Sequence, residues 1–129
     1  MATFYQVSAQ AVTCGFYIPL EKVTFTVTFV YAFNTVEERL SLWEELSNLN
    51  ATTPLSTHPW AVVGNFNQIL RVSQHSRHPA ADVDTSGIDE FILALQDADL
   101  VEAQAKGLAF TWWNNQDGNP TSKKIDHAL

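Results

Sequence analysis

A short apolar run that ends at a glycine constrains the fold of this chain more than any other stretch. The run Trp60–Val63 is nearly unbroken, which is typical of a strand buried on both faces. It stops at Gly64, and two amides, Asn65 and Asn67, then flank an aromatic residue. α/β folds often build sites where a buried strand ends, but Asn and Gly also favour simple turns. On the pattern alone, a strand-to-loop turn is favoured over a site.

Composition indicates one globular domain over residues 1–129, because 46% of the residues are hydrophobic and 12% are aromatic. The net charge is −7, and only seven residues are Lys or Arg. This balance disfavours tight non-specific binding to nucleic acid, which depends on basic side chains that neutralise phosphates. The single cysteine, Cys14, excludes an internal disulfide and a multi-cysteine zinc site. We expect Cys14 to be a small buried hydrophobe.

The sequence contains no stretch that is typical of membrane insertion or secretion. Residues 1–20 lack a basic region followed by an apolar one. The longest apolar stretch, Val23–Phe33, is interrupted by threonine and is too short to span a bilayer. We therefore expect a soluble intracellular protein, cytoplasmic or nuclear, that has no membrane partner.

Two strands and a hairpin are predicted near the N-terminus. Residues 1–9 are weakly patterned, and we expect them to fray. Gln10–Ile18 reads as a strand, and Thr24–Phe29 alternates with period two, which places phenylalanine and valine on one face and threonine on the other. The few residues between the two strands predict an antiparallel hairpin.

Two helices are predicted on opposite layers, with the strand Trp60–Gly64 between them. The first runs over Val36–Leu49 and follows Thr35, which has capping-box spacing to Glu38. The second runs over Ser86–Leu95, with Ser86 as its cap. The helical spacing of apolar residues supports the first helix; its stripe consists of Val36, Leu40, Trp43, Leu46 and Leu49.

The rest of the chain reads as a loop and a second hairpin. Residues 71–85 have no periodicity and predict a long surface loop. A strand is expected over Phe110–Trp113, a turn over Asp117–Pro120 and a returning strand over Lys124–Leu129. Core packing of Trp112 and Trp113 is favoured over base stacking.

Several sequence blocks, in order, resemble the endonuclease/exonuclease/phosphatase (deoxyribonuclease I-like) superfamily. Gly64-Asn65-Phe66-Asn67 is similar to its Gly-Asp-Phe-Asn motif, and Tyr31 and Asn34 fit its Val-Tyr-x-x-Asn segment. The resemblance runs from about residue 10 to 129. It is closest in kind to the endonuclease domain of plant LINE-type (non-LTR) retrotransposons, because two further blocks match that group: Gly107–Gln116 and Lys124–Leu129.

The resemblance implies a fold and an activity. The fold would be part of an α/β sandwich of two packed sheets flanked by helices, and the activity would be Mg²⁺-dependent hydrolysis of phosphodiester bonds in DNA. The resemblance implies that Asn67 contacts a phosphate, that Tyr31 and Asn34 line the same cleft, and that Asp126 braces a catalytic histidine. It places Asn65 at the position of the catalytic aspartate.

This chain departs from the family at the catalytic position. Asn65 is a neutral amide, so it cannot act as a proton acceptor or bring charge to a metal. The family's metal-binding glutamate and terminal Ser-Asp-His motif do not occur in these 129 residues, and His127 stands where the family has arginine. We therefore expect a truncated, transposon-derived and catalytically inactive domain that binds no Mg²⁺. The net charge disfavours DNA, the family's partner. An active Mg²⁺-dependent endonuclease and a non-catalytic binding module stay open as alternatives.

Two other patterns resemble parts of metal sites, but each lacks necessary ligands. Asp82–Gly87 imitates the start of a calcium loop, but Leu93 stands where the bidentate glutamate must be. His75 and His78 lack further ligands nearby, so a solvated loop is favoured. If strands of the family fold are missing, exposed sheet edges and apolar faces should make the isolated chain poorly soluble or partly molten.

Overall fold

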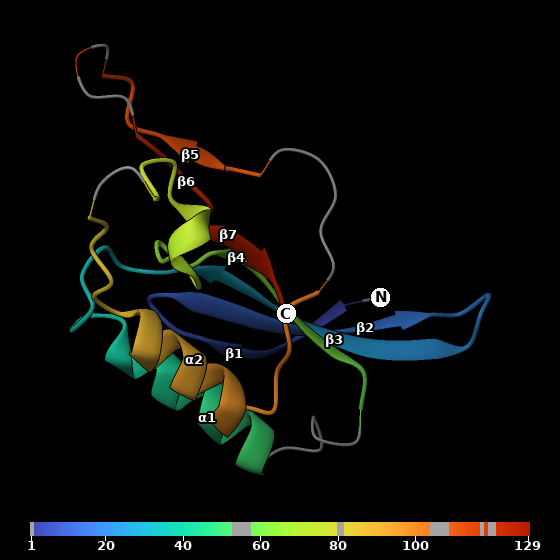
Figure 1. The fold of residues 1–129 in the computed structure, drawn as a ribbon. Coiled ribbons are helices and arrows are strands. Elements are labelled where there is room, and N and C mark those ends of the chain that lie inside the picture. Colours follow the sequence, from blue (N-terminus) through green and yellow to red (C-terminus); the bar gives the residue numbers. More distant parts are fainter. Residues whose placement is uncertain (1, 53–57, 80–81, 104–108, 117, 119–120) are drawn as a thin grey trace.

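The structure is a computed structural model that describes residues 2–52, 58–79, 82–103, 109–116, 118 and 121–129. The described residues form a five-stranded mixed sheet, a separate two-stranded sheet and two α-helices. Figure 1 shows both helices on one side of the larger sheet. None of the described helices has the length and apolar character needed to cross a lipid bilayer. The mixed α/β class is as predicted.

The five strands of the larger sheet lie in the order β1-β2-β3-β4-β7. Only the β3–β4 pair is parallel; the other neighbours are antiparallel. The smaller sheet pairs β5 with β6. The elements are β1 Ala2–Val7, β2 Ala11–Ile18, β3 Val23–Tyr31, α1 Leu40–Thr52, β4 Trp60–Asn65, the 3-10 turn Val72–Gln74, α2 Ile88–Asp97, β5 Trp112–Trp113, β6 Ser122–Lys123 and β7 Asp126–Ala128.

The N-terminal hairpin is confirmed, since β2 and β3 pair in continuous antiparallel register. The expectation that residues 1–9 fray is wrong, because Ala2–Val7 pairs with β2 as a fifth strand. A shift of register between Phe4 and Gln6 interrupts the alternation. That irregularity explains why the sequence pattern was weak there.

The strand Trp60–Asn65 lies inside the sheet, between β3 and β7, as predicted. Burial on both faces is not observed. Val62 points to the helices and is fully buried, whereas its neighbours Ala61 and Val63 face the other side and are only partly buried. One face of the sheet is therefore covered by helices, and on the other face no helix of the described part of the chain covers the apolar side chains.

Both helices begin later than predicted. Thr35 and Glu38 form the expected capping bonds, in which the Glu38 amide donates to Thr35 Oγ1 at 3.2 Å. The capped segment, residues 36–39, is a turn, and α1 begins only at Leu40. Leu40 is consequently 50% exposed, and Leu42 takes its place in the core. α2 begins after Gly87, which is its N-cap residue and has a φ of 84°. The sequence had predicted Ser86 as the cap.

The two helices share one layer, which corrects the prediction of opposite layers. Trp43 of α1 stacks on Phe91 of α2 with ring centroids 5.0 Å apart. Phe66, directly after β4, stacks on Phe91 at 5.2 Å. Each helix has a single apolar stripe, and both stripes are needed to enclose Phe66, which is fully buried.

The threonine face of β3 is the buried one. Thr13 and Thr28 bond through their hydroxyl oxygens at 2.9 Å, and the Trp60 indole donates to Thr28 Oγ1. The opposite face carries the phenylalanines, and none of them belongs to the core under the helices. We name this side the open face; among its described residues are Val12, Cys14, Phe16, Phe25, Val27, Phe29, Ala61 and Val63.

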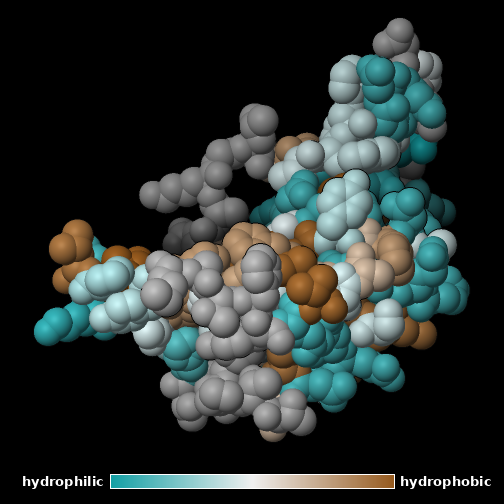
Figure 2. Space-filling model, turned by 180° about the vertical axis from the view of Figure 1, so that it is seen from behind, coloured by the Kyte–Doolittle hydropathy of each residue, from teal (hydrophilic) through white to brown (hydrophobic). Residues whose placement is uncertain are grey.

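Side chains on the open face contact one another. Phe16 stacks on Phe25 at 5.3 Å and meets Phe29 edge-on at 6.4 Å. Cys14, on the same face, is a buried free thiol, as predicted. Phe29 is still 47% exposed. Hydrophobic side chains also reach the surface at the tip of the β2–β3 hairpin, at the left in Figure 2.

The predicted hairpin of Phe110–Trp113 and Lys124–Leu129 is wrong. Trp112–Trp113 forms β5 and pairs with Ser122–Lys123, whereas Asp126–Ala128 forms β7 and pairs with β4 in the larger sheet. The predicted surface loop 71–85 contains a 3-10 turn. Residues 117, 119 and 120 of the predicted turn, 80–81 of the loop and 107–108 of one matching block lie outside the described residues.

We predict that the open face makes the isolated chain bind hydrophobic dyes and associate. Phe29→Gln should lower binding of anilinonaphthalene sulfonate and reduce aggregation, and should cost less than about 1 kcal/mol of unfolding free energy because the ring is half exposed. Leu20→Gln, at the hairpin tip and 94% exposed, is the matched control and should change dye binding less. A monodisperse wild-type chain that melts sharply and binds no dye would contradict this prediction.

Candidate functional site

Three of the predicted site residues lie side by side at one end of the sheet. Tyr31, the last residue of β3, is in register with Asn65 at the end of β4. Asn65 is in turn in register with Asp126 at the start of β7. Directly paired residues point to the same face with side chains about 5 Å apart, and here that face is the open one. Tyr31 is 73% exposed, whereas Asn65 and Asp126 are partly buried.

The turn that follows β4 uses both asparagines structurally. A Cβ at Gly64 would lie 2.1 Å from the Val30 carbonyl oxygen, so only glycine fits there. Asn65 Oδ1 accepts a hydrogen bond from the Asn67 amide at 2.8 Å. Asn67 has φ of 51°, and its side-chain nitrogen donates to the Ala32 carbonyl at 2.6 Å. The turn predicted from the pattern is confirmed, and the catalytic role of these residues stays a prediction.

A cavity of about 310 Å³ lies beside this turn. Asn34 and Asn67 line it; Tyr31, Asn65 and Asp126 do not. The predicted residues therefore divide into two neighbouring groups, one on the open face and one in the cavity. The other lining side chains were not predicted as a site; the charged and aromatic ones are Arg39, His75, Asp84, Trp112 and Lys123.

Arg39 joins the chain segments that form this cavity. Its guanidinium donates to the carbonyl oxygens of Asn34 at 2.8 Å, Phe33 at 3.1 Å and Asn67 at 3.2 Å, and to Gln68 Oε1 at 2.6 Å. The residue is 3% exposed. Burial lowers the pKa of Arg39, while the negative charges of Glu37 and Glu90 act in the opposite direction. The ends of β3 and β4 are thus joined by one buried cation.

Sequence reasoning missed Arg39, although one signal was present. A basic residue near a helix N-terminus is unfavourable to the helix dipole, and Arg39 directly precedes α1. A residue placed against its local preference often has a tertiary partner. Here the partners are backbone carbonyls, which the sequence does not display.

The cavity brings together groups of both charge signs. Burial, together with the positive charges of Lys123 and Arg77, lowers the pKa of His75. Hydrogen bonds from the Ser86 hydroxyl and amide lower the pKa of Asp84. At neutral pH the imidazole is therefore neutral and the carboxylate ionised. The interpretation of this segment as solvated loop missed the contribution of His75 and Asp84 to the cavity wall.

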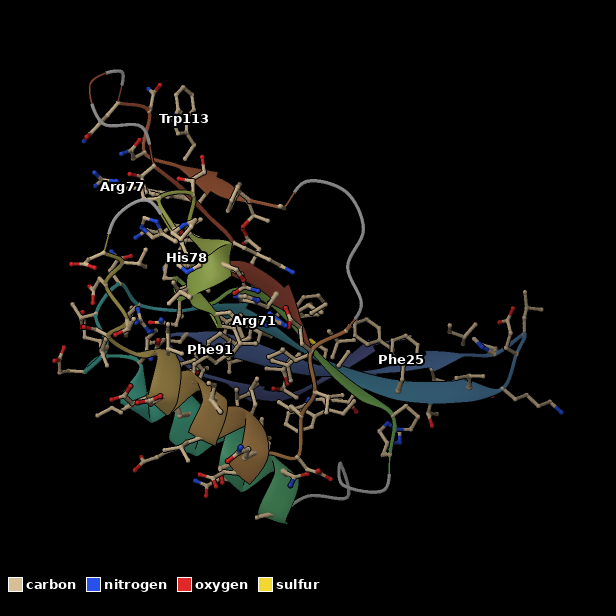
Figure 3. All side chains as sticks on the ribbon, in the orientation of Figure 1. Phe25, Arg71, Arg77, His78, Phe91 and Trp113 are labelled. Atoms are coloured by element: carbon tan, nitrogen blue, oxygen red, sulfur yellow. The ribbon has the colours of Figure 1, made fainter. Side chains whose placement is uncertain are left out.

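The tryptophan side chains correct the prediction of core packing. Trp112 is 41% exposed and Trp113 is 55% exposed. The Lys123 ammonium lies 5.5 Å from the centroid of the Trp112 ring, within the range of a cation–π contact. Trp113 projects away from the larger sheet in Figure 3. No helix among the described residues covers the short β5–β6 sheet, so both tryptophan side chains remain exposed.

His127 is a core residue rather than a member of the site. Its Nε2 lies 2.8 Å from the Gln68 carbonyl oxygen, and its ring meets Phe66 and Phe91 edge-on. Among the described residues no hydrogen-bond partner is found for its Nδ1, which is 3.9 Å from Glu102 Oε1. Burial lowers the pKa of His127 against the opposing effects of Gln68 and Glu102.

The donor set at the strand ends does not fit Mg²⁺, which needs carboxylate oxygens. Asp126 is the one carboxylate of the Tyr31–Asn65–Asp126 group, and Asn65 brings no charge. Within the described ranges, no three His, Cys, Asp or Glu side chains are grouped so that they could hold a metal ion. Whether the chain binds Mg²⁺ stays a prediction.

Comparison of the sequence with protein-family models and with curated proteins found no match. The relationship to the endonuclease/exonuclease/phosphatase superfamily therefore depends on the sequence blocks quoted above.

We predict that Arg39→Met destabilises the chain by about 3 kcal/mol, because it leaves several buried carbonyl and amide oxygens without a donor. Arg77→Met, at an exposed position, should change the unfolding free energy by less than about 0.5 kcal/mol. Urea unfolding of both variants measures the difference. Equal stability of the two variants would show that Arg39 does not hold the strand ends together.

We predict that His127 makes the fold sensitive to acid. Its pKa is lowered in the folded chain and returns to about 6.5 on unfolding, so below that pH the unfolded chain binds more protons. The stabilising contribution is present above pH of about 6.5 and is lost as pH falls. The free energy of unfolding between pH of about 7.5 and 5 should fall less steeply in His127→Phe than in wild type. Equal slopes in His127→Phe and in the wild type would contradict this prediction.

Proposed function

We propose that this chain is a catalytically silent, transposon-derived portion of an endonuclease/exonuclease/phosphatase-type domain. One observation carries the proposal: the residues that the family motif would place at a phosphodiester site, Tyr31, Asn65 and Asp126, lie in one register across three strand ends. They are far apart in the sequence, and chance would not favour their alignment on one face. The neutral amide at Asn65 accounts for the missing chemistry.

The open face supports the two-sheet sandwich as the fold of the complete domain. Its apolar side chains have no helix above them, and Phe29 is 47% exposed. Two sheets that pack face to face interdigitate such side chains in a layer about 10 Å thick. A second sheet on the open face would place the Tyr31–Asn65–Asp126 group at the end of the interface between sheets, where a cleft can form.

In the Tyr31–Asn65–Asp126 group, residue 65 can bind and orient a phosphate but supplies no carboxylate to activate water. Hydrolysis of a phosphodiester requires an activated water and stabilisation of the charge that develops on the phosphate. Asn65 is hydrogen-bonded to the Asn67 amide, and an aspartate in its place could accept the same bond. The change of one residue thus leaves the turn intact while removing a negative charge from the motif.

We predict that Asn65→Asp alone restores no nicking of supercoiled DNA in this chain. In a chimera that supplies the family's metal-binding glutamate and Ser-Asp-His motif, the same change should raise Mg²⁺-dependent nicking by about 10²–10⁴-fold. The two effects differ because catalytic groups that act as a unit are not additive. Asn115→Asp, which adds the same charge at an exposed position, is the matched control.

Two outcomes would contradict the proposal. Mg²⁺-dependent nicking by the unmodified chain would favour the active endonuclease instead. Equal activity of the chimeras with Asn65 and with Asp at that position would show that residue 65 is not the catalytic position, and the assignment of the motif would fail.

A non-catalytic nucleic-acid binding module is the second candidate, and the exposed Trp112 favours it. This ring lines the cavity together with Asn34, Asn67 and the basic Lys123. Exposed tryptophans stack on unpaired bases, while basic side chains contact the phosphates. The net charge of −7 describes the whole chain and not this region.

We predict that single-stranded oligonucleotides bind more weakly, by about tenfold, to Trp112→Ala than to wild type, because one base-stacking contact is lost. Trp113→Ala removes a more exposed ring that does not line the cavity, and it should have a smaller effect. Fluorescence anisotropy at low salt measures both affinities. If the two variants bind equally well, the cavity is not the binding site.

A further inference from the structure

A groove between the two helices combines an apolar floor with an acidic rim. It has a volume of about 400 Å³ and is separate from the cavity at the strand ends, with which it shares no residue. Trp43 and Ala94 form its buried base. Leu40 is 50% exposed and Leu93 is 57% exposed along it. Exposed leucines that gather at a groove with a polar rim mark surfaces to which other proteins bind.

The charge around the groove has a single sign. Glu44, Glu90 and Asp97 line it, and no basic residue does. Neither α1 nor α2 contains a lysine, arginine or histidine. Arg39, which directly precedes α1, is buried and donates to carbonyl and amide oxygens on the side of the strand ends; its charge interacts with Glu90 and offsets part of the negative charge there. The negative field of the helix layer is therefore not neutralised from within the helices.

We propose that this groove binds a basic amphipathic helix of a partner protein. A helix laid between α1 and α2 would bury Leu40 and Leu93 against apolar residues spaced i, i+3, i+4 and i+7. Lysine or arginine on its flanks would approach the acidic rim, which sets both the choice of partner and the rate of association. α1 has 13 residues and is about 20 Å long, enough for about four turns of a partner helix.

The same charge argues against other partners for this surface. DNA, phosphorylated segments and anionic lipid surfaces carry negative charge and would be repelled by the acidic rim. The proposal does not depend on nuclease ancestry, because the groove is formed by the outer sides of α1 and α2.

The probe is a fluorescein-labelled peptide of about 18 residues with leucines at helical spacing and lysines at most other positions. The control peptide has the same composition, with its leucines redistributed so that no apolar face forms. The patterned peptide should bind at least about tenfold more tightly by anisotropy at low salt, and added salt should weaken the binding. Equal binding of the two peptides would overturn the proposal.

Two groove variants and two matched controls locate the contact. Leu93→Gln and Glu44→Lys should each weaken binding by about tenfold. Leu20→Gln and Glu21→Lys make the same changes in the β2–β3 turn, where Leu20 is 94% exposed, and should leave the affinity unchanged. Circular dichroism verifies that each variant is folded.

Each other outcome overturns a stated part of the proposal. Unchanged binding in both groove variants would show that the peptide binds elsewhere. Weakening by Leu93→Gln alone would show that the partner is apolar and not selected for basic charge. If sedimentation shows that the chain dimerises and Leu93→Gln abolishes the dimer, the occupant is a second copy of this chain, and the proposed partner is wrong.

Discussion

The buried guanidinium of Arg39 is the interaction on which the strand-end region depends. It donates to oxygen atoms from the segment after β3 and from the turn after β4, including the Asn34 and Asn67 carbonyls. A buried cation is costly unless its donors are satisfied, and four acceptors meet that requirement here. The two parallel strands are thus fixed at the end where the candidate site lies, and the cavity beside the turn takes its shape from these bonds.

The side-chain amide of Asn67 stabilises the turn, and the same amide would contact a phosphate in the proposed site. A substitution of Asn67 would therefore change both the turn and the site. The Asn67 side chain donates to Ala32, which links the turn to the end of β3. Asn65 differs, since the side-chain hydrogen bond described for it is the one that its Oδ1 accepts from the Asn67 amide. A carboxylate could fill that role equally well. A neutral amide at residue 65 is therefore compatible with the same backbone turn, as our proposal of a catalytically silent domain requires.

The charge of the chain is distributed unevenly, and this explains how one small domain can present two different surfaces. The helix layer is acidic and contains no basic residue in α1 or α2. The cavity at the strand ends carries both signs, with Lys123 over Trp112 and the ionised Asp84 in its wall. A net charge of −7 alone does not show this difference between the two surfaces, so it could not decide between partners.

Local patterns predicted β2, β3, β4 and the presence of both helices, because alternation and helical spacing are properties of neighbouring residues. They did not predict that Thr26 and Thr28 would be the buried side of β3, since that choice depends on which face the helices cover. The shared helix layer depends on the packing of Phe66 against both Trp43 and Phe91, which local sequence patterns do not display. The exposure of Trp112 and the carbonyl partners of Arg39 likewise depend on tertiary packing, which local sequence patterns do not predict.

The family motif implied roles for Tyr31, Asn65 and Asp126 but did not predict that they pair across three strands, because the register of distant strands is set by the whole sheet. The central claim is that this group keeps the geometry of a phosphodiester site but does not hold the catalytic metal. A titration with Mn²⁺, followed by paramagnetic broadening of backbone amide resonances, measures this directly. We expect no selective broadening at residues 31, 65 and 126 compared with other exposed amides. Selective broadening of these three resonances at low micromolar Mn²⁺ would contradict the account.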